Sequence, residues 1–432
     1  MVARAEEETP GAVVSGIRTS AARDALVARA LAHPVRTVLI AYAVSRLLAV
    51  AAMWVAATWF QTPAGVGHLH PGVGDILRLW DARWYHRIVY SGYPLPLPVD
   101  GDTGAITYSA WAFFPLFPML VKLLVALGVD FTVAAVALNL VLGAIGTVLV
   151  WLISRMAAHA APQAHRDRLA LVATCLWCLY PATGILVMPY SEALALVLTA
   201  GSILLVMRRR YLGAAGVVVL LGFTRAVVPA VGVVVLVHLV ARLREESRSW
   251  RTAFAGERAR LATLAAAVAG SAFSWPATVG LATGRATAFY DVQAVWGQRP
   301  QEGPFVQWIA WAWGLHGLFG VLLLAGCLTA YVILVAGRHG RWLPMEVRAW
   351  AYAYPLYLFA VVRPITSMWR FLVLDFPLAA LVASVAMRTS SGGRIVPHWR
   401  RRVALVVLPL ILGMFWWTAT LLTYVPWGAS PP

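Results

Sequence analysis

One short block of the sequence combines a carboxylate with aromatic residues at helical spacing. Apolar or aromatic residues occupy positions 80, 84, 85, 88 and 89, a period that predicts a short helix with one apolar face. Its Trp and Tyr side chains are typical of a helix in the membrane interface, and Gly92 and Pro94 end it. Asp81 would lie beside these rings, where a carboxylate can act as a general base. The alternative is a surface acid paired with Arg78 or Arg83.

A second set of ionisable residues lies at the predicted ends of apolar runs. Because charge is costly near lipid, each is a candidate for function: Glu192, Arg225, Arg363 and Arg370. Structural roles are open for them too. Glu192 could cap a helix with Ser191, and Arg370 could form an ion pair with Asp375.

The composition indicates where these residues must work. Of 432 residues, 61% are hydrophobic and only 12% are charged, and the mean hydropathy is +0.74. A soluble chain needs about a quarter of its residues charged, so the excess must face lipid. The formal charge of +17 therefore indicates membrane topology and contact with anionic head groups, and nucleic acid is not expected as a partner.

Apolar runs predict an all-α polytopic membrane protein with about eleven spans. The run 111–128 is interrupted by Pro115, Pro118 and Lys122, and we expect it not to cross. The stronger spans are 37–60, 131–154, 168–187, 190–207, 226–242, 260–282, 308–336, 369–387 and 403–425, and the weaker ones are 211–224 and 348–362.

The arginines orient this arrangement. With 111–128 outside the bilayer core and a cytoplasmic N-terminus, most basic residues fall in inside segments, in agreement with the positive-inside rule. The segment 61–130 then becomes a long first extracytoplasmic loop that carries the interfacial helices. Asp81, Glu192, Arg225, Arg363 and Arg370 all lie at the outside border. Acids beside arginines and aromatics suit a substrate with a lipid-linked phosphate and a polar sugar.

Other polar motifs favour ordinary structure. Asp75 follows two glycines and would cap a helix, and Asp100-Gly101-Asp102 is typical of a turn. The Cys175 to Cys178 spacing falls inside an apolar run and indicates packing. No cofactor is expected, although a divalent metal is not excluded.

Three blocks resemble the PIG-V-like mannosyltransferases, membrane enzymes of the GT-C glycosyltransferase class. The segment from Trp80-Asp81 through Trp84-Tyr85 to Gly92-Tyr93 looks like the family's W-D-x-x-W-Y loop, and 113–118 like its F-F-P-L-[YF]-P. The segment from Tyr180-Pro181 to Glu192 resembles its Y-S-E block. Weaker similarities are Thr224-Arg225 and the stretch from Arg370 to Pro377.

The resemblance implies a GT-C-like bundle and a polyprenyl-phosphate sugar donor, most simply of mannose. Asp81 would be the catalytic base outside the cytoplasm, and Arg225 and Arg370 would stabilise the phosphate. Tyr85, Tyr190, Glu192 and Arg363 complete the expected substrate-binding set. The acceptor would be a glycolipid, a glycan or a protein, and the enzyme would lie in the plasma membrane.

The expected regions are a cytoplasmic segment 1–36, a transmembrane catalytic region 37–387, and a basic cytoplasmic loop with the last span, 388–432. Two alternatives remain. A GT-C enzyme for another sugar would share these motifs, and a transporter or flippase of a lipid-linked saccharide would use the outer arginines without a base. A transporter would favour paired acids at mid-span and an inverted repeat.

Overall fold

The structure, a computed structural model, describes residues 27–63, 65–156, 163–245, 256–298, 302–388 and 395–424. Within these ranges the chain is helical, and the only β pairing there is two isolated bridges, Val99–Ile106 and Arg388–Ile395. The all-α prediction is confirmed. The parts of the predicted terminal regions at 1–26, 389–394 and 425–432 lie outside the described residues.

The long helices alternate with short helices that build the loops. The long ones are α2 (Pro34–Trp59), α6 (Phe131–Met156), α7 (Gln163–Cys178), α8 (Glu192–Met207), α9 (Tyr211–Gly222), α10 (Val228–Glu245), α12 (Arg258–Thr283), α14 (Val306–Ala336), α15 (Met345–Val361), α17 (Phe376–Met387) and α18 (Trp399–Trp417). The short ones are α3 (Val73–Ile76), α4 (Asp81–Ser91), η1 (Ala110–Ala112), α5 (Leu116–Val125), η2 (Pro181–Leu186), α13 (Ala288–Val295), α16 (Met368–Phe371), η4 (Leu372–Leu374) and η5 (Thr418–Leu422).

In the part of the chain that the structure describes, five helices are long and apolar enough to cross a membrane: α2, α6, α12, α14 and α18 with η5. The segment Met368–Leu374 and α17 would make a sixth if the 79° bend between them interrupts a single span. The chain is therefore an integral membrane protein. The count of about eleven spans and their orientation stay predictions.

Proline explains where helices depart from the predicted spans. The run 168–187 is not one helix, because α7 ends at Cys178 and Pro181 begins a separate 3₁₀ turn. The run 369–387 is likewise interrupted, with Asp375 between η4 and α17 and Pro377 in the first turn of α17. Within 111–128 only α5 is α-helical, and its ten residues extend about 15 Å, half of a hydrocarbon core.

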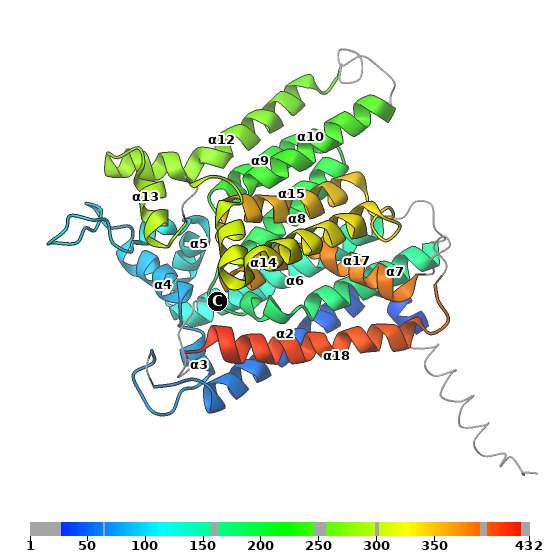
Figure 1. Ribbon diagram of the computed structural model, residues 1–432, viewed down its shortest axis with the longest axis horizontal. Helices are drawn as coiled ribbons and strands as arrows, with labels where there is room; N and C mark the ends of the chain where they lie inside the picture. The colour runs from blue at the N-terminus through cyan, green and yellow to red at the C-terminus, as the bar shows by residue number, and fades with distance from the viewer. Residues whose placement is uncertain are drawn as a thin grey trace, which may run out of the picture.

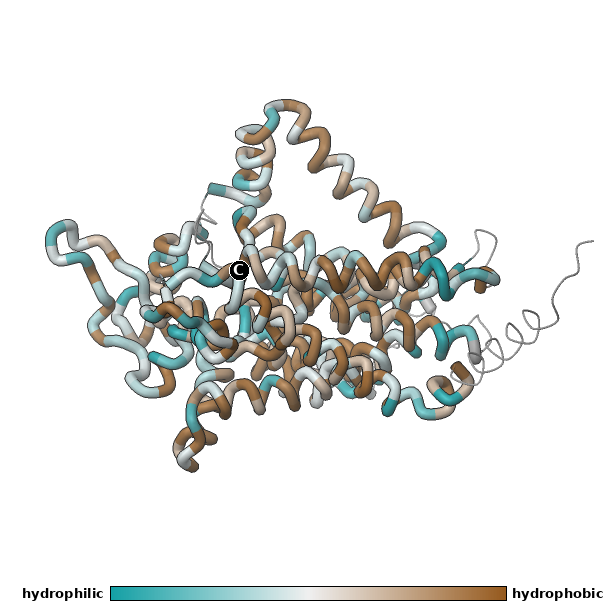
Figure 2. Tube along the Cα trace, turned by 90° about the horizontal axis from the view of Figure 1, so that it is seen from below, coloured by the Kyte–Doolittle hydropathy of each residue, from teal (hydrophilic) through white to brown (hydrophobic). Residues whose placement is uncertain are grey.

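The long helices run side by side and the loop helices gather at one end (Figure 1). α2 and α18 lie together along one side, and α9, α10 and α12 along the opposite side, with α6, α8, α15 and α17 between them. The short helices α3, α4, α5 and α13 cover the left end in Figure 1. Figure 2 shows hydrophobic residues along the middle of the helices and hydrophilic residues at both ends, as a bilayer requires.

Candidate active site

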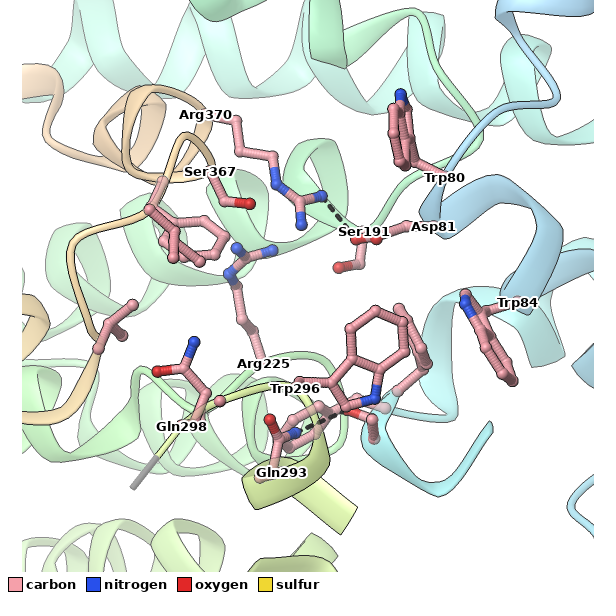
Figure 3. Close-up of a pocket in the computed structure, with 18 of the residues that line it drawn as sticks. Trp80, Asp81, Trp84, Ser191, Arg225, Gln293, Trp296, Gln298, Ser367 and Arg370 are labelled. Carbon is pink, nitrogen blue, oxygen red and sulfur yellow. Dashed lines mark hydrogen bonds and ion pairs between the residues drawn. The ribbon is translucent and has the colours of Figure 1, made fainter. Parts of the chain in front are cut away.

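A cavity of about 1320 Å³ opens between the loop helices and the long helices. Most of its lining comes from α4 with the segment before α5, the turn after α9, the end of α13, and the segment 362–371. The rest comes from Ser191, the end of α15 and Tyr424. The residues labelled in Figure 3 project into this space from opposite sides. The volume exceeds the 300–1,000 Å³ of an ordinary small-molecule pocket.

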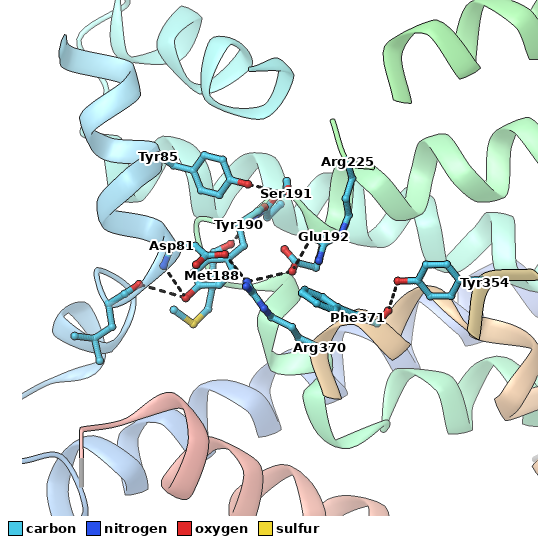
Figure 4. A network of polar contacts seen from close by, with 12 residues as sticks. Asp81, Tyr85, Met188, Tyr190, Ser191, Glu192, Arg225, Tyr354, Arg370 and Phe371 are labelled. Atoms are coloured by element: carbon cyan, nitrogen blue, oxygen red, sulfur yellow. Dashed lines mark hydrogen bonds and ion pairs between the residues drawn. The ribbon is translucent and has the colours of Figure 1, made fainter. Parts of the chain in front are cut away.

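Four charged side chains form a continuous chain of ion pairs at this cavity (Figure 4). Arg370 Nη1 lies 2.6 Å from Asp81 Oδ2 and 3.3 Å from Glu192 Oε1, and Arg225 Nη1 lies 3.0 Å from the same Glu192 oxygen. Asp81 and Arg225 keep 16% and 17% of their side chains exposed, whereas Glu192 keeps 1%. Asp81 and Arg225 are therefore accessible to a substrate. Glu192 is buried behind them and pairs with Arg225 and Arg370.

Asp81 is the first residue of α4, and Trp80 sets its position. Trp80 has a positive φ of 55°, a conformation that costs energy for a bulky residue and is common at functional sites. Its indole donates to the Leu422 carbonyl at 2.8 Å, and its ring stacks on Tyr424 at 4.3 Å. These contacts with the segment after α18 hold the strained turn in place.

The segment before α8 presents Tyr190, Ser191 and Glu192. Buried Asn139 on α6 donates to the carbonyls of Met188 and Tyr190, which fixes this turn. The Tyr190 hydroxyl accepts from the Asp81 backbone N–H at 3.3 Å, and the Tyr85 hydroxyl lies 3.0 Å from that of Ser191. Glu192 begins α8, where the helix dipole stabilises a negative charge.

The two arginines come from short turns held by backbone contacts. Arg225 follows Gly222, whose close approach to α12 leaves no room for a side chain, since an added Cβ would lie 2.6 Å from the Ser271 carbonyl. Arg370 lies on α16, where the Tyr354 hydroxyl donates to the Phe371 carbonyl at 2.8 Å. Both guanidinium groups lie over the Phe371 ring, at 4.6 Å for Arg225 and 5.2 Å for Arg370.

Burial and charge act in opposite directions on Asp81. Burial raises the pKa of its carboxyl above the ordinary value, Arg370 lowers it, and Glu192 raises it again. The net direction is upward. Burial also raises the pKa of the Tyr85 hydroxyl, with Asp81 and Glu192 adding to the effect, so Tyr85 stays protonated as a hydrogen-bonding group.

The structure brings the predicted site residues together. Asp81, Tyr85, Arg225, Arg363 and Arg370 line the cavity. Tyr190 and Glu192 lie buried directly behind the lining, in contact with Arg370. Their roles in binding or catalysis stay predictions.

The structure contradicts some of the structural roles considered for these polar residues and confirms others. Asp81 pairs with Arg370 and not with Arg78 or Arg83, and Asp375 accepts from Tyr331 and does not pair with Arg370. Ser191 makes no side-chain cap, and Glu192 binds the arginines. By contrast, Asp75 does cap α3 through the Gly72 N–H, and Asp100 accepts from the backbone of 102 and 103 in a turn.

Sequence reasoning missed the wall of the cavity opposite the ion pairs. There Trp296 contacts Trp84, Phe113 and Tyr108, and Gln293 and Gln298 lie beside it. The residues of α13 and the turn after it carry no motif that could have pointed to the site. Within the described ranges no group of three His, Cys, Asp or Glu side chains could hold a metal ion. The expectation of no cofactor stays a prediction.

Part of the chain matches the model of a known protein family. The model of the family described as mannosyltransferase (PIG-V) matches residues 72–249, which include the Trp80-Asp81 block, the Tyr190-Ser191-Glu192 block and Arg225. The resemblance expected from the motifs is confirmed. No curated protein matches the chain significantly.

Solved structures with a similar chain path include the Archaeoglobus fulgidus oligosaccharyltransferase. The form tethered to an acceptor peptide containing the NVT sequon has 13% identity and a TM-score of 0.45, covering 93% of this chain and 56% of that one. The complex with Zn and sulfate has 13% identity and a TM-score of 0.44, covering 91% and 54%. The chain thus spans just over half the length of these proteins.

Proposed function

We propose that this enzyme moves a hexose from a polyprenyl-phosphate donor to an acceptor hydroxyl. The premise is that a chain with a mannosyltransferase (PIG-V) region is a membrane glycosyltransferase. The sugar is mannose, the family's own. Transfer occurs on the extracytoplasmic face of the plasma membrane, at the end of the bundle that holds the loop helices.

One observation carries the proposal: the chain of ion pairs from Asp81 through Arg370 and Glu192 to Arg225, at the wall of the cavity. A carboxylate next to two guanidinium groups supplies a base and an anion site within one space. Arginine suits a phosphate because its planar fork binds two oxygens at once.

In the proposed step, the Asp81 carboxylate accepts the proton of the acceptor hydroxyl as that oxygen attacks the anomeric carbon. A new C–O bond forms, the bond between the anomeric carbon and the phosphate oxygen breaks, and polyprenyl phosphate leaves with the electron pair. The configuration inverts. Arg225 and Arg370 stabilise the charge that develops on the phosphate, and Arg363 at the cavity rim contributes further positive charge.

The ion pair with Asp81 gives Arg370 a second role in this scheme. Arg370, 2.6 Å from Asp81, lowers the pKa of this carboxyl, so movement of Arg370 toward the donor phosphate would make Asp81 a stronger base. Glu192 already lies 3.3 Å from the same nitrogen and keeps Arg370 within the site during this exchange. Tyr85 and Tyr190 orient Asp81 and the residues around it.

The test is Asp81→Asn. This change keeps the size of the side chain and removes the base, so we expect sugar transfer to fall by about 10²–10⁴-fold while donor binding persists. Purified enzyme in detergent is assayed for release of polyprenyl phosphate and for product. Asp102→Asn, an exposed acid of the same loop, is the matched control and should transfer normally.

Near-normal turnover by the Asp81 variant would overturn the assignment of the base. Absence of any release by the wild-type enzyme in detergent, where transport has no meaning, would favour the flippase alternative. A divalent metal requirement is tested in the same assay by adding a chelator, and we expect no change.

A further inference from the structure

Asp375 is a buried carboxyl that the proposed mechanism leaves without a role. It lies at the 79° bend between the segment Met368–Leu374 and α17, and only 3% of it is exposed. Its Oδ1 atom is buried without a hydrogen-bond partner, and the side chain forms no ion pair in the described part of the chain. The neighbouring Arg370 pairs with Asp81 and Glu192 instead. An ionised carboxyl at this position is strongly destabilising, because nothing offsets the loss of its water.

The other carboxyl oxygen of Asp375 contacts the Tyr331 hydroxyl on α14. This hydroxyl lies 3.0 Å from Asp375 Oδ2 and 2.9 Å from the Ala351 carbonyl oxygen on α15. The Ala351 carbonyl needs a donor from outside its helix, because its helical partner would be the N–H of position 355, which is a proline. An unpaired carbonyl is costly inside a membrane protein. The hydrogen of Tyr331 is therefore committed to Ala351.

A phenol carries one hydrogen, so Tyr331 cannot donate in both contacts. With that hydrogen directed to Ala351, two oxygen atoms face each other 3.0 Å apart at Asp375. A hydrogen between them must come from the carboxyl itself. Burial, the missing counter-charge and the count of hydrogens thus agree on a protonated Asp375 that donates to Tyr331.

Two side chains of α14 hold the segment that carries Arg370. The Trp308 indole donates to the Val362 carbonyl at 2.7 Å, where this segment begins, and Tyr331 contacts Asp375, where it ends. Few residues of α14 are buried, so these bonds matter for its attachment to the other helices. Loss of the bond at Asp375 would release the bend and with it the turn of Arg370.

We infer that Asp375 is a positioning residue that works in its protonated form. Its proton completes the hydrogen bond to Tyr331, and this neutral pair fixes the bend from which the Arg370 turn extends. Asp375 does not line the cavity, so it takes no part in the proton transfer assigned to Asp81. The effect on Arg370 rests on the proposed function, whereas the protonation of Asp375 does not.

Infrared difference spectroscopy tests the proton without an assay of activity. Purified full-length enzyme near neutral pH is compared with Asp375→Asn. We expect the wild type to show the carbonyl band of a protonated carboxyl, shifted in D₂O, and the variant to lack it. Asp102→Asn, which changes an exposed acid of the first loop, is the control and should lose only carboxylate bands. Loss of carboxylate bands in Asp375→Asn overturns the inference.

Two substitutions test the role in positioning. Asp375→Asn keeps a donor toward Tyr331, so we expect the KM for the polyprenyl-phosphate sugar to stay within about twofold of the wild-type value. Asp375→Leu is similar in size but has no donor, and the same KM should rise about tenfold. Thermal unfolding of each variant shows whether it is folded.

Equal losses in the two variants overturn the inference, because they indicate a need for the carboxylate charge. A normal KM in folded Asp375→Leu overturns the positioning role. If wild-type enzyme releases no polyprenyl phosphate from the donor, the proposed function fails, and the infrared comparison still decides whether Asp375 carries a proton.

Discussion

In the proposed mechanism, the charges of single neighbouring residues govern when Asp81 works as a base. Burial raises its pKa, Arg370 lowers it, and Glu192 raises it, so the carboxyl is balanced between neighbours of opposite charge. A base is active only when deprotonated, and activity is therefore lost as the pH falls through this pKa. The acid limb of the pH profile should lie above the value of about 3.9 expected for an ordinary Asp.

Two substitutions should move this limb in opposite directions. Glu192→Gln removes a negative neighbour, lowers the pKa of Asp81 and shifts the limb to lower pH. Arg370→Gln removes a positive neighbour, raises the pKa and shifts the limb to higher pH. The measurement is kcat/KM as a function of pH, which reports the pKa values of groups in the free enzyme. The pH at which kcat/KM falls is compared between variants independently of the maximal value that each variant reaches.

The control for this pair is Asp291→Asn, which removes an acid that pairs with Arg285 away from the cavity. Its profile should match that of the wild type. Shifts of both site variants in the same direction would contradict the balance described for Asp81.

At the scale of elements, the short segment α16–η4 is held by donors from the long helices around it. Trp177 and Trp350 donate to the carbonyls of Val373 and Leu374, and Tyr354 donates to that of Phe371. Interruption of a span exposes carbonyls that must find other partners inside the protein. These aromatic donors supply them and so fix the position of Arg370.

Tyr354→Phe should therefore act through Arg370. The Phe371 carbonyl loses its partner, which costs about 1–3 kcal/mol, and the displaced guanidinium should raise the donor KM by about tenfold. Thermal unfolding and steady-state kinetics measure the two effects. Tyr352→Phe on the same helix is the control, because its hydroxyl makes only a 3.4 Å bond at an exposed position, and it should change neither.

The helices themselves could be predicted more fully than their contacts. The period around Asp81 and the position of Gly92 predicted α4, and the prolines at 115 and 118 predicted that 111–128 would not form a long span. The pairing of Asp81 with Arg370 joins positions 289 apart, and neither neighbourhood carries a local sign of the other. Local reasoning instead suggested Arg78, Arg83 and Asp375 as partners, the acids and bases nearest in sequence.

For the whole molecule, orientation in the membrane decides whether the cavity meets a substrate. The arginine distribution predicts that the loop helices lie outside and that Arg208-Arg209-Arg210 lies inside. A reporter inserted in 94–106 should be accessible from outside the cell, and one at 208–210 should be accessible only from the cytoplasm. The reverse result would put the cavity on the cytoplasmic face and exclude an extracytoplasmic reaction.

The segment after α18 packs against the loop before α4, although the two segments are synthesised at very different times. The loop containing Asp81 follows the first span, whereas its supports, the Leu422 carbonyl and the Tyr424 ring, emerge some 340 residues later. Gln61 and Thr62, which follow α2, also form hydrogen bonds with Tyr424. The end of α2 therefore depends on the same late segment of the chain. A nascent chain can thus hold all of the proposed site residues in the membrane while the turn at Trp80 still lacks its supports. If Asp81 is the base, enzymatic competence arises only when the last helix has inserted.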